Sequence, residues 1–402
     1  MTDFSPTTPD ELLSVIQWAA GEQSPLKVMG QGTKRGIGRP AQTAHALNLS
    51  KLTGVTMYEP AELVLSARAG TPMAEIEKLL ADQNQRLDFE PLDYGPLHGT
   101  GRGGGTIGGV LAANLAGPRR LKAGAARDHI LGISAVSGRG EAFKAGGRVV
   151  KNVTGYDVSK AMAGSWGTLA VCTDVTFKVL PAAETEITVA IRDLSDEQAS
   201  VAMAKAMGSS AEVSSAAHLP QGVTALVAGG TLGTNAATLL RLEGLAPSIA
   251  YRLRLLQELL KDMGEPQALD AAQSTPVWRD IRDCIPFADG TQDPVWRVSM
   301  QPSHAWKMVR DLRSDASASV FYDWQGGLAW LRLEPGNAHA ESLRNLVKKH
   351  GGGHATLVRG DVALRAEIPA FEPQPPALRA LAQRVKASFD PHDILNPGRM
   401  AG

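Results

Sequence analysis

Glycine-rich backbone between Gly99 and Gly109 carries the clearest chemical signal in this sequence. Seven glycines occupy positions 99, 101, 103, 104, 105, 108 and 109. Glycine at this density gives up side-chain packing and folding entropy, which is typical of backbone that lies close against a ligand. Thr106 is a suitable N-cap for a helix over residues 107–116, whose free N–H groups would point into the glycine loop. Such helix starts bind phosphate groups, so the stretch predicts a pyrophosphate site.

A second glycine loop follows a short apolar strand predicted at residues 26–29. Its residues, Gly30 to Gly36, combine glycine with Thr33, Lys34 and Arg35. Backbone N–H groups and a hydroxyl can bind phosphate oxygens there, while the basic side chains supply positive charge. The loop lacks the GK[ST] core of a Walker motif. A surface hairpin loop remains the alternative interpretation.

The motif GxGxxG at Gly99–Gly104 does not predict a Rossmann fold. That fingerprint requires a strand directly before it and an acidic residue at the end of a second strand. Here residues 91–96 are turn-rich, and no βαβ unit surrounds the motif. Arginine and lysine residues at 119, 120, 122 and 127 follow the glycine stretch. They are either an anion-facing loop or a solvated basic surface.

The elements that would hold these loops are helices and strands in mixed order. Thr8, Pro9 and Glu11 predict a capped helix start with a capping box. Strands are predicted at 63–68, 129–136, 141–144 and 173–180, and helices at 71–80 and 107–116. Pro181 marks a boundary, so we predict domains at 1–182 and 183–385 with a closing segment at 386–402. The second domain would contain strands such as 222–228 and 327–333, and the fold class is α+β.

Composition and charge restrict the class of protein. The 402 residues include 41 Lys+Arg and 41 Asp+Glu, so no global field favours nucleic acid or an anionic membrane. The start has no secretory signal, and no apolar run reaches the length of a membrane helix. Two cysteines fit a reducing compartment, which predicts a cytoplasmic location. The histidines show no metal-ligand spacing, so we predict no metal site.

Three segments in order resemble the FAD-binding domain of the vanillyl-alcohol-oxidase/p-cresol-methylhydroxylase family. Val28–Lys34 is similar to its first phosphate-binding loop, and Thr106–Gly109 is similar to its central loop. Gly164–Val171 is similar to the segment beside the adenine. The tail at 389–398 is similar to the family's C-terminal return onto this domain.

The resemblance implies a two-subdomain FAD-binding domain of the p-cresol-methylhydroxylase type, followed by an α+β cap domain. It implies non-covalent FAD, because the first loop contains no histidine for a covalent link. The implied cofactor-binding residues are Gly30, Gln31, Gly32, Thr33, Lys34, Pro91, Thr106, Ile107, Gly108, Gly109, Asn114, Arg120, Gly167, Thr168 and Val171.

Within this family, the run at 148–157 and the overall length resemble the smaller FAD-binding subunits of bacterial glycolate oxidases. The resemblance implies oxidation of glycolate to glyoxylate, a catalytic FAD-containing partner subunit and an iron–sulfur partner subunit. The small 2-hydroxy acid would be reached through the complex, and any membrane contact would come through partners. Catalytic relatives carry histidine motifs in the cap, which Tyr322–Gly327 and Gly351–Thr356 do not contain. The general base is therefore unknown.

Two other functions stay open from the residues. One is a self-sufficient flavin dehydrogenase for a 2-hydroxy acid, with His354 or Arg359 in its site. The other is a structural subunit that retains the flavin fold. The intact glycine loops argue against the structural subunit, because clustered glycines serve little purpose without a ligand.

Overall fold

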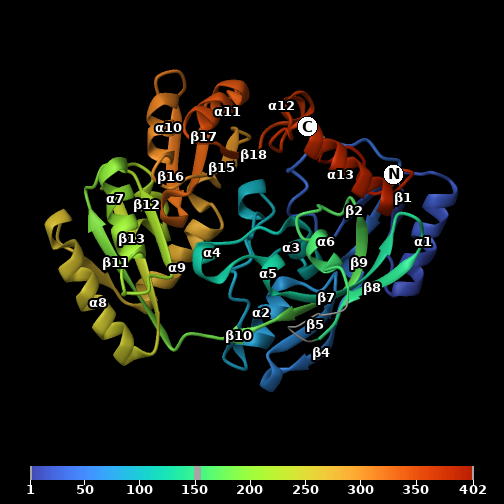
Figure 1. The fold of residues 1–402 in the computed structure, drawn as a ribbon, viewed down its shortest axis with the longest axis horizontal. Helices are drawn as coiled ribbons and strands as arrows, with labels where there is room; N and C mark the ends of the chain where they lie inside the picture. Colours follow the sequence, from blue (N-terminus) through green and yellow to red (C-terminus); the bar gives the residue numbers. More distant parts are fainter. Residues whose placement is uncertain (1, 149–154, 401–402) are drawn as a thin grey trace.

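The N-terminal part of the chain begins with a small parallel sheet. The computed structural model describes residues 2–148 and 155–400 (Figure 1). Strand β3 (His45–Asn48) lies between β1 (Thr2–Phe4) and β2 (Leu26–Met29). Helix α1 (Pro9–Gly21) buries Leu12 and Ile16 against this sheet. The predicted cap is present, since Thr8 Oγ1 accepts a hydrogen bond from the Glu11 N–H at 3.2 Å. The predicted capping box is wrong, because the Glu11 carboxylate accepts from the N–H of Thr7 instead.

A five-stranded antiparallel sheet forms the second subdomain. Helices α2 (Met73–Ala81) and α3 (Ile107–Ala113) share an apolar core with it, to which Ile76, Ile107 and Val110 contribute. A two-stranded ribbon pairs β6 (Gln85–Arg86) with β10 (Leu180–Pro181). The strands of the sheet in spatial order are β4 (Val55–Glu59), β5 (Val64–Arg68), β9 (Ala170–Lys178), β7 (Ile130–Ser137) and β8 (Ala142–Gly146). Short helices in this part are α4 (Arg120–Ala123), α5 (Ala126–His129) and α6 (Val158–Met162).

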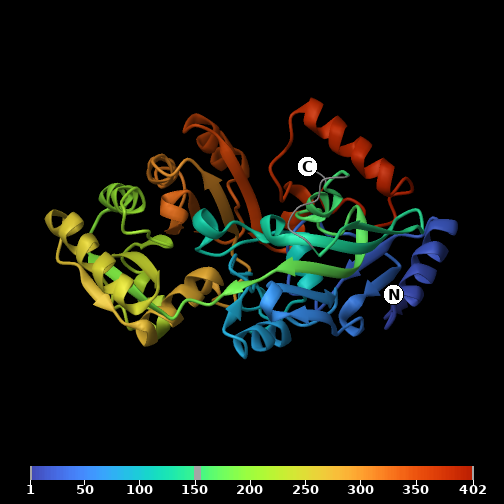
Figure 2. The same cartoon turned by 60° about the horizontal axis from the view of Figure 1, so that its bottom comes forward.

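An eight-stranded antiparallel sheet dominates the rest of the chain and lies beside the N-terminal part (Figure 2). Its residues alternate between two cores, as a strand's geometry requires. On β13, Leu240 packs toward the helices of the outer face, and Leu239 packs toward the N-terminal part. The strands in spatial order are β14 (Gln267–Leu269), β11 (Thr185–Arg192), β13 (Ala237–Gly244), β12 (Ser215–Leu219), β16 (Ala318–Asp323), β17 (Leu328–Leu333), β15 (Val295–Met300) and β18 (Gly353–Arg359).

Helices cover both faces of this sheet. Helix α9 (Ala271–Arg282) lies on the face toward the N-terminal part and contributes Val277, Trp278 and Ile281 to the core there. The outer face is covered by α7 (Asp196–Met207), α8 (Ala246–Leu260), α10 (Ala305–Leu312) and α11 (Ala340–Lys349). The fold is α+β, as predicted. The predicted boundary at 182/183 falls between β10 and β11, and we keep the domain division as a proposal.

Two predicted elements are wrong in detail. Residues 222–228 form turns and a short 3₁₀ helix rather than a strand. There Gly222 has a left-handed φ of 86°, and the Thr224 hydroxyl donates to the carbonyl of Leu219. The helix predicted over 107–116 ends at Ala113, because Asn114 adopts a left-handed conformation with φ 50° and terminates it.

The C-terminal segment returns to the first sheet. After α12 (Val362–Glu367), helix α13 (Pro376–Phe389) leads the chain back beside β2 and α1 (Figure 1). Leu395 then forms a parallel bridge with Leu26, and the Leu26 N–H donates to the carbonyl of Ile394 at 2.7 Å. The tail therefore extends the parallel sheet at the edge formed by β2.

Candidate cofactor site

A cleft lies between the loop after β2, the start of α3 and the turn before β9. It contains about 860 Å³ of space between the atoms, part of which is open solvent. Ten of the predicted cofactor-binding residues line it. They are Gly30, Gln31, Gly32, Thr33, Lys34, Thr106, Gly108, Gly109, Gly167 and Val171.

Glycine is required where the two loops approach each other. A Cβ on Gly30 would lie 2.5 Å from Thr106 Oγ1, and a Cβ on Gly104 would lie 2.6 Å from Thr33 Cγ2. The Gly105 N–H donates to Gln31 Oε1 at 2.8 Å. The two predicted phosphate loops are therefore packed together and form one continuous wall.

The prediction of free N–H groups at the start of α3 is wrong, because these groups donate hydrogen bonds within the protein. The N–H of Ile107 donates to Thr71 O at 3.0 Å, and the N–H of Gly108 donates to Ala69 O at 2.9 Å. The Gly109 N–H donates to Thr106 Oγ1 at 3.3 Å. The start of α3 therefore lines the cleft with closely packed backbone but supplies no N–H donors for a phosphate.

The donors suited to a pyrophosphate come from the first loop. Within the described ranges, the backbone N–H groups of Gly32, Thr33 and Lys34 donate no hydrogen bond to another residue. The cationic residues Lys34, Arg35 and Arg399 also line the cleft. Unpaired N–H groups beside three cations match the oxygens and charge of a pyrophosphate. These residues therefore fit FAD through its phosphates.

Burial lowers the pKa of Lys34 to about 8, and Arg399 adds to this lowering while Asp93 and Asp283 oppose it. A bound pyrophosphate favours the charged ammonium, so FAD binding should weaken as pH rises through 8. We expect the Kd for FAD to increase about tenfold between pH 7 and pH 9. The Lys34→Met variant should bind more weakly at pH 7 and lose most of this pH dependence. Fluorescence titration at several pH values measures both, and an equal pH dependence in the variant would exclude Lys34 as the cause.

Five predicted residues do not line the cleft. Ile107 is buried in the core of the second subdomain. Asn114 caps α3 and accepts from the Arg127 N–H at 2.9 Å, while Arg120 pairs with Asp128 at 3.4 Å. The Thr168 hydroxyl donates to Ser165 O. The fifth, Pro91, is buried next to Glu90.

Two residues of the C-terminal return line the cleft and were not predicted. Asn396 is buried, and its Oδ1 accepts from the Val28 N–H at 2.9 Å while its Nδ2 donates to Trp166 O at 3.0 Å. Arg399 lies over the Trp166 ring and donates to Lys34 O at 2.9 Å. The tail therefore joins β2, the first loop and the turn before β9.

Replacing Asn396 by alanine should destabilise the protein by about 2–4 kcal/mol, because buried partners at Val28 and Trp166 are left unpaired. The FAD affinity should fall as well, since Val28 and Trp166 line the cleft. Urea unfolding with and without FAD measures both effects. Asn345→Ala, on the exposed face of α11, is the matched control. Unfolding and FAD binding like those of the control would contradict the assigned role of Asn396.

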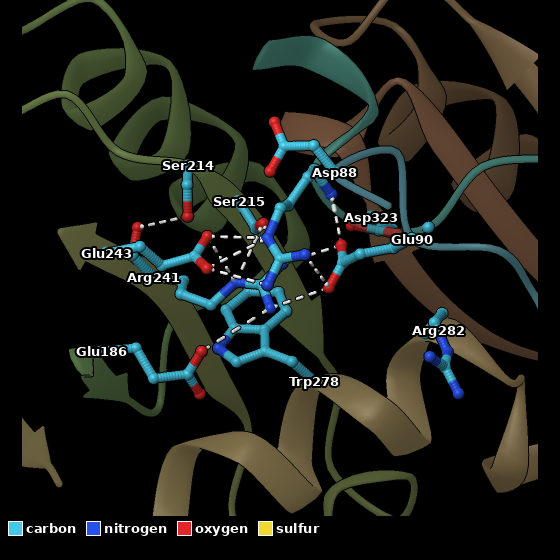
Figure 3. A network of polar contacts seen from close by, with 12 residues as sticks. Asp88, Glu90, Glu186, Ser214, Ser215, Arg241, Glu243, Trp278, Arg282 and Asp323 are labelled. Carbon is cyan, nitrogen blue, oxygen red and sulfur yellow. Dashed lines mark hydrogen bonds and ion pairs between the residues drawn. The ribbon is translucent and has the colours of Figure 1, made fainter. Parts of the chain in front are cut away.

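A buried ion network joins the cleft-bearing part to the eight-stranded sheet (Figure 3). Arg241 of β13 donates to both carboxylate oxygens of Glu90 at 2.9 Å, and its guanidinium stacks on Trp278 at 4.8 Å. Arg119 pairs with Glu243 at 2.8 Å and with Glu90 at 3.4 Å. Both interpretations of the basic cluster, an anion-facing loop and a solvated surface, are therefore wrong for Arg119, which is largely buried and paired within the protein.

The charges in this network hold one another ionised. Burial alone would raise the pKa of Glu90, but Arg119 and Arg241 outweigh it and keep the pKa below its usual value. Asp323 lies beside the network, and burial raises its pKa to about 7 even though its carboxylate accepts from the Trp324 N–H. Among the residues that the structure describes, no group of His, Cys, Asp and Glu side chains is arranged to hold a metal ion.

Comparison with known proteins agrees with this fold and cleft. A family model described as an FAD binding domain matches residues 3–146. The crystal structure of p-cresol methylhydroxylase with substrate bound superposes with a TM-score of 0.73, covering 99% of this chain and 88% of that chain at 13% identity. The superposition shows that this chain has the fold of p-cresol methylhydroxylase, and residues 3–146 are similar to FAD binding domains.

Sequence similarity along nearly the whole chain identifies the family to which it belongs. Glycolate oxidase subunit GlcE of Escherichia coli is 32% identical over 392 residues, which is 97% of this chain and 96% of the relative. Glycolate oxidase subunit GlcD of Bacillus subtilis is 27% identical over 186 residues, 46% of this chain and 38% of that protein. The chain belongs to the family of glycolate oxidase subunit GlcE. The run at 148–157 that suggested this family lies largely outside the described residues.

Proposed function

We propose that this chain is the FAD-binding subunit of a glycolate oxidase that converts glycolate to glyoxylate. The observation that carries the proposal is a cleft with unpaired donors and three cations, in a chain similar to GlcE along nearly its whole length. FAD, when bound, supplies an acceptor for the hydride of the glycolate α-carbon. Conversion of glycolate to glyoxylate would also require a base that takes the hydroxyl proton.

The chain's own residues bind and orient the cofactor in this proposal. Lys34, Arg399 and the N–H groups of 32–34 would hold the pyrophosphate. Ala170, Val171 and Met162 are apolar residues that line the same cleft, and the adenine would lie against them. The closely packed loops at Gly30 and Thr106 would exclude water from the phosphates. This account extends the predicted set of binding residues to Asn396 and Arg399.

The packing between the two parts of the chain favours catalysis together with partner subunits. Tyr94 and Trp166 of the N-terminal part share one apolar cluster with Trp324 and Trp330 of the eight-stranded sheet. Among the charged groups nearby, Glu90, Glu243, Arg119 and Arg241 are paired in the buried network (Figure 3). The proposed partners are a catalytic FAD-containing subunit and an iron–sulfur subunit. The chain has only two cysteines, Cys172 and Cys284, too few for an iron–sulfur cluster of its own, so the electrons must pass to a partner chain or a soluble acceptor.

One observation favours the second candidate function, a self-sufficient 2-hydroxy-acid dehydrogenase. Burial raises the pKa of the Asp323 carboxyl to about 7, which suits a general base, but Asp323 does not line the cofactor cleft. The residues first considered for this function do not support it. His354 lies exposed on the edge strand β18. The Arg359 guanidinium donates hydrogen bonds to the backbone carbonyl oxygens of Phe287 and Asp293.

One structural finding bears on the cellular location of the chain. No helix in the described ranges has the length and apolar character needed to cross a bilayer. We propose a cytoplasmic location, with any membrane contact made through partner subunits.

Anaerobic addition of glycolate to the FAD-loaded chain tests the proposal. We expect the flavin spectrum of the isolated chain to stay oxidised and to bleach when the partner subunits are added. Rapid bleaching of the isolated chain that is lost in Asp323→Asn would establish the second candidate instead. Absence of bleaching with every partner present would contradict the glycolate oxidase assignment.

A further inference from the structure

The glycine loop at 99–105 has almost no side chains with which to fix its own conformation. Only Thr100 and Arg102 interrupt its glycines, and Gly99, Gly101, Gly103 and Gly105 all have left-handed φ values between 72° and 105°. Glycine loses more conformational freedom on ordering than any other residue. A loop of this composition therefore needs an external contact to be ordered before a ligand binds.

Arg102 supplies that contact by reaching helix α9 of the cap, which is the part of the chain built on the eight-stranded sheet. Its Nη2 lies 2.5 Å from Asp280 Oδ1 on α9, and its Nη1 lies 3.7 Å from Asp283 Oδ2 just after α9. Both carboxylates are buried, whereas the Arg102 side chain is 39% exposed. The buried carboxylates of the cap are therefore the fixed partners of this ion pair, and the pair restrains the glycine loop.

A second link runs from the cap to the same loop through Asp93. Asp283 Oδ1 accepts from the Asp93 N–H at 3.0 Å, and Asp93 Oδ2 accepts from the Gly103 N–H at 2.7 Å. The end of α9 therefore reaches the glycine loop at Arg102 directly and at Gly103 through Asp93. The carboxylate of Asp283 belongs to both links.

The loop in turn sets the position of residues that line the cofactor cleft. Gly104 packs against Thr33, and the Gly105 N–H donates to Gln31 Oε1 at 2.8 Å. Gln31, Thr33 and Gly105 all line the cleft, whereas Arg102 does not. Displacement of Arg102 would therefore reach the cofactor only through the loop.

We propose that Arg102 is a positioning residue, which ties the glycine loop to helix α9 of the cap through Asp280 and thereby sets the affinity for FAD. This inference rests on the proposed FAD site and adds a coupling between the cap and that site. The free chain keeps the loop near its bound conformation, so less conformational entropy is lost when FAD binds. Any partner or ligand that moves α9 would change FAD affinity by the same link, and FAD would change its binding in return.

Equilibrium titration with FAD, followed by flavin fluorescence, tests the tether. We expect Arg102→Gln and Asp280→Asn each to raise the Kd about five- to tenfold, the loss of one charge-assisted contact. The double variant should bind FAD no more weakly than the weaker-binding single variant, because both changes break the same ion pair. Asn at 280 keeps an acceptor for the Ala228 N–H, which Asp280 binds at 2.8 Å. Arg332→Gln is the control, since it breaks a cap ion pair with Asp289 at similar exposure.

Measurements on the FAD-free chain separate positioning from general stability. Arg102→Gln should leave the thermal midpoint of the FAD-free chain near that of the control and speed amide hydrogen exchange at Gly103–Gly105. Arg102→Lys keeps the charge and should recover part of the FAD affinity, and it replaces the glutamine variant should that variant fail to fold. A Kd for Arg102→Gln within twofold of the wild type, or effects that add in the double variant, would overturn the inference. A wild-type chain that does not bind FAD would instead contradict the proposed function.

Discussion

Replacing Arg241 by methionine is expected to lower the free energy of unfolding by about 3–5 kcal/mol. Arg241 is 2% exposed and donates to both oxygens of Glu90 and to Ser215 Oγ. Its removal leaves Glu90 and Glu243 buried with one cation fewer, so each carboxylate loses compensation for its desolvation. Methionine retains the apolar contact with Trp278, which limits the effect to charge and hydrogen bonds.

Urea unfolding followed by tryptophan fluorescence measures this change. Arg310→Met is the matched control, because its ion pair with Asp311 is largely exposed and contributes little. Adding Glu90→Gln to Arg241→Met should recover part of the loss, since the uncompensated buried charge is then removed. A variant at 241 as stable as the control would mean that the network in Figure 3 does not hold the two parts of the chain together.

Replacing Gly30 by valine is expected to weaken FAD binding by about 10- to 100-fold. A Cβ at position 30 would lie 2.5 Å from Thr106 Oγ1 and 2.9 Å from Thr106 Cγ2. The wall formed by the two loops must therefore separate, and the first loop moves away from the pyrophosphate. The FAD-free fold should survive, because the clash is with the side chain of Thr106 rather than with backbone.

Fluorescence titration with FAD and circular dichroism of the FAD-free chain test this prediction together. Gly21→Val is the control, since a Cβ at position 21 meets no atom within 4 Å. Unchanged FAD affinity in Gly30→Val, with a folded chain, would show that the cofactor does not use this wall.

The sequence identified the parts of the site that local spacing encodes. Glycines in two loops, with Thr33 and Lys34 in the first, predicted a phosphate cleft, and the structure places both loops around one cleft. Local spacing could not show which N–H groups stay free. The N–H groups of Ile107 and Gly108 are used by Thr71 and Ala69, which precede α3 by more than 35 residues.

Long-range contacts account for the residues that the sequence did not identify. Asn396 reaches Val28 across 368 positions, and nothing in the local pattern of the tail specifies that contact. Arg119 belongs to a run of basic residues that is typical of a solvated surface. Its partners, Glu90 and Glu243, come together only when the eight-stranded sheet packs on the N-terminal part.

Titration of the isolated, FAD-free chain with FAD tests the central claim most directly. Calorimetry should show saturable binding of one FAD per chain, which weakens in Gly30→Val and above pH 8. Heat changes no larger than those of dilution, from a chain shown to be folded by circular dichroism, would contradict the assignment of the cleft as a cofactor site.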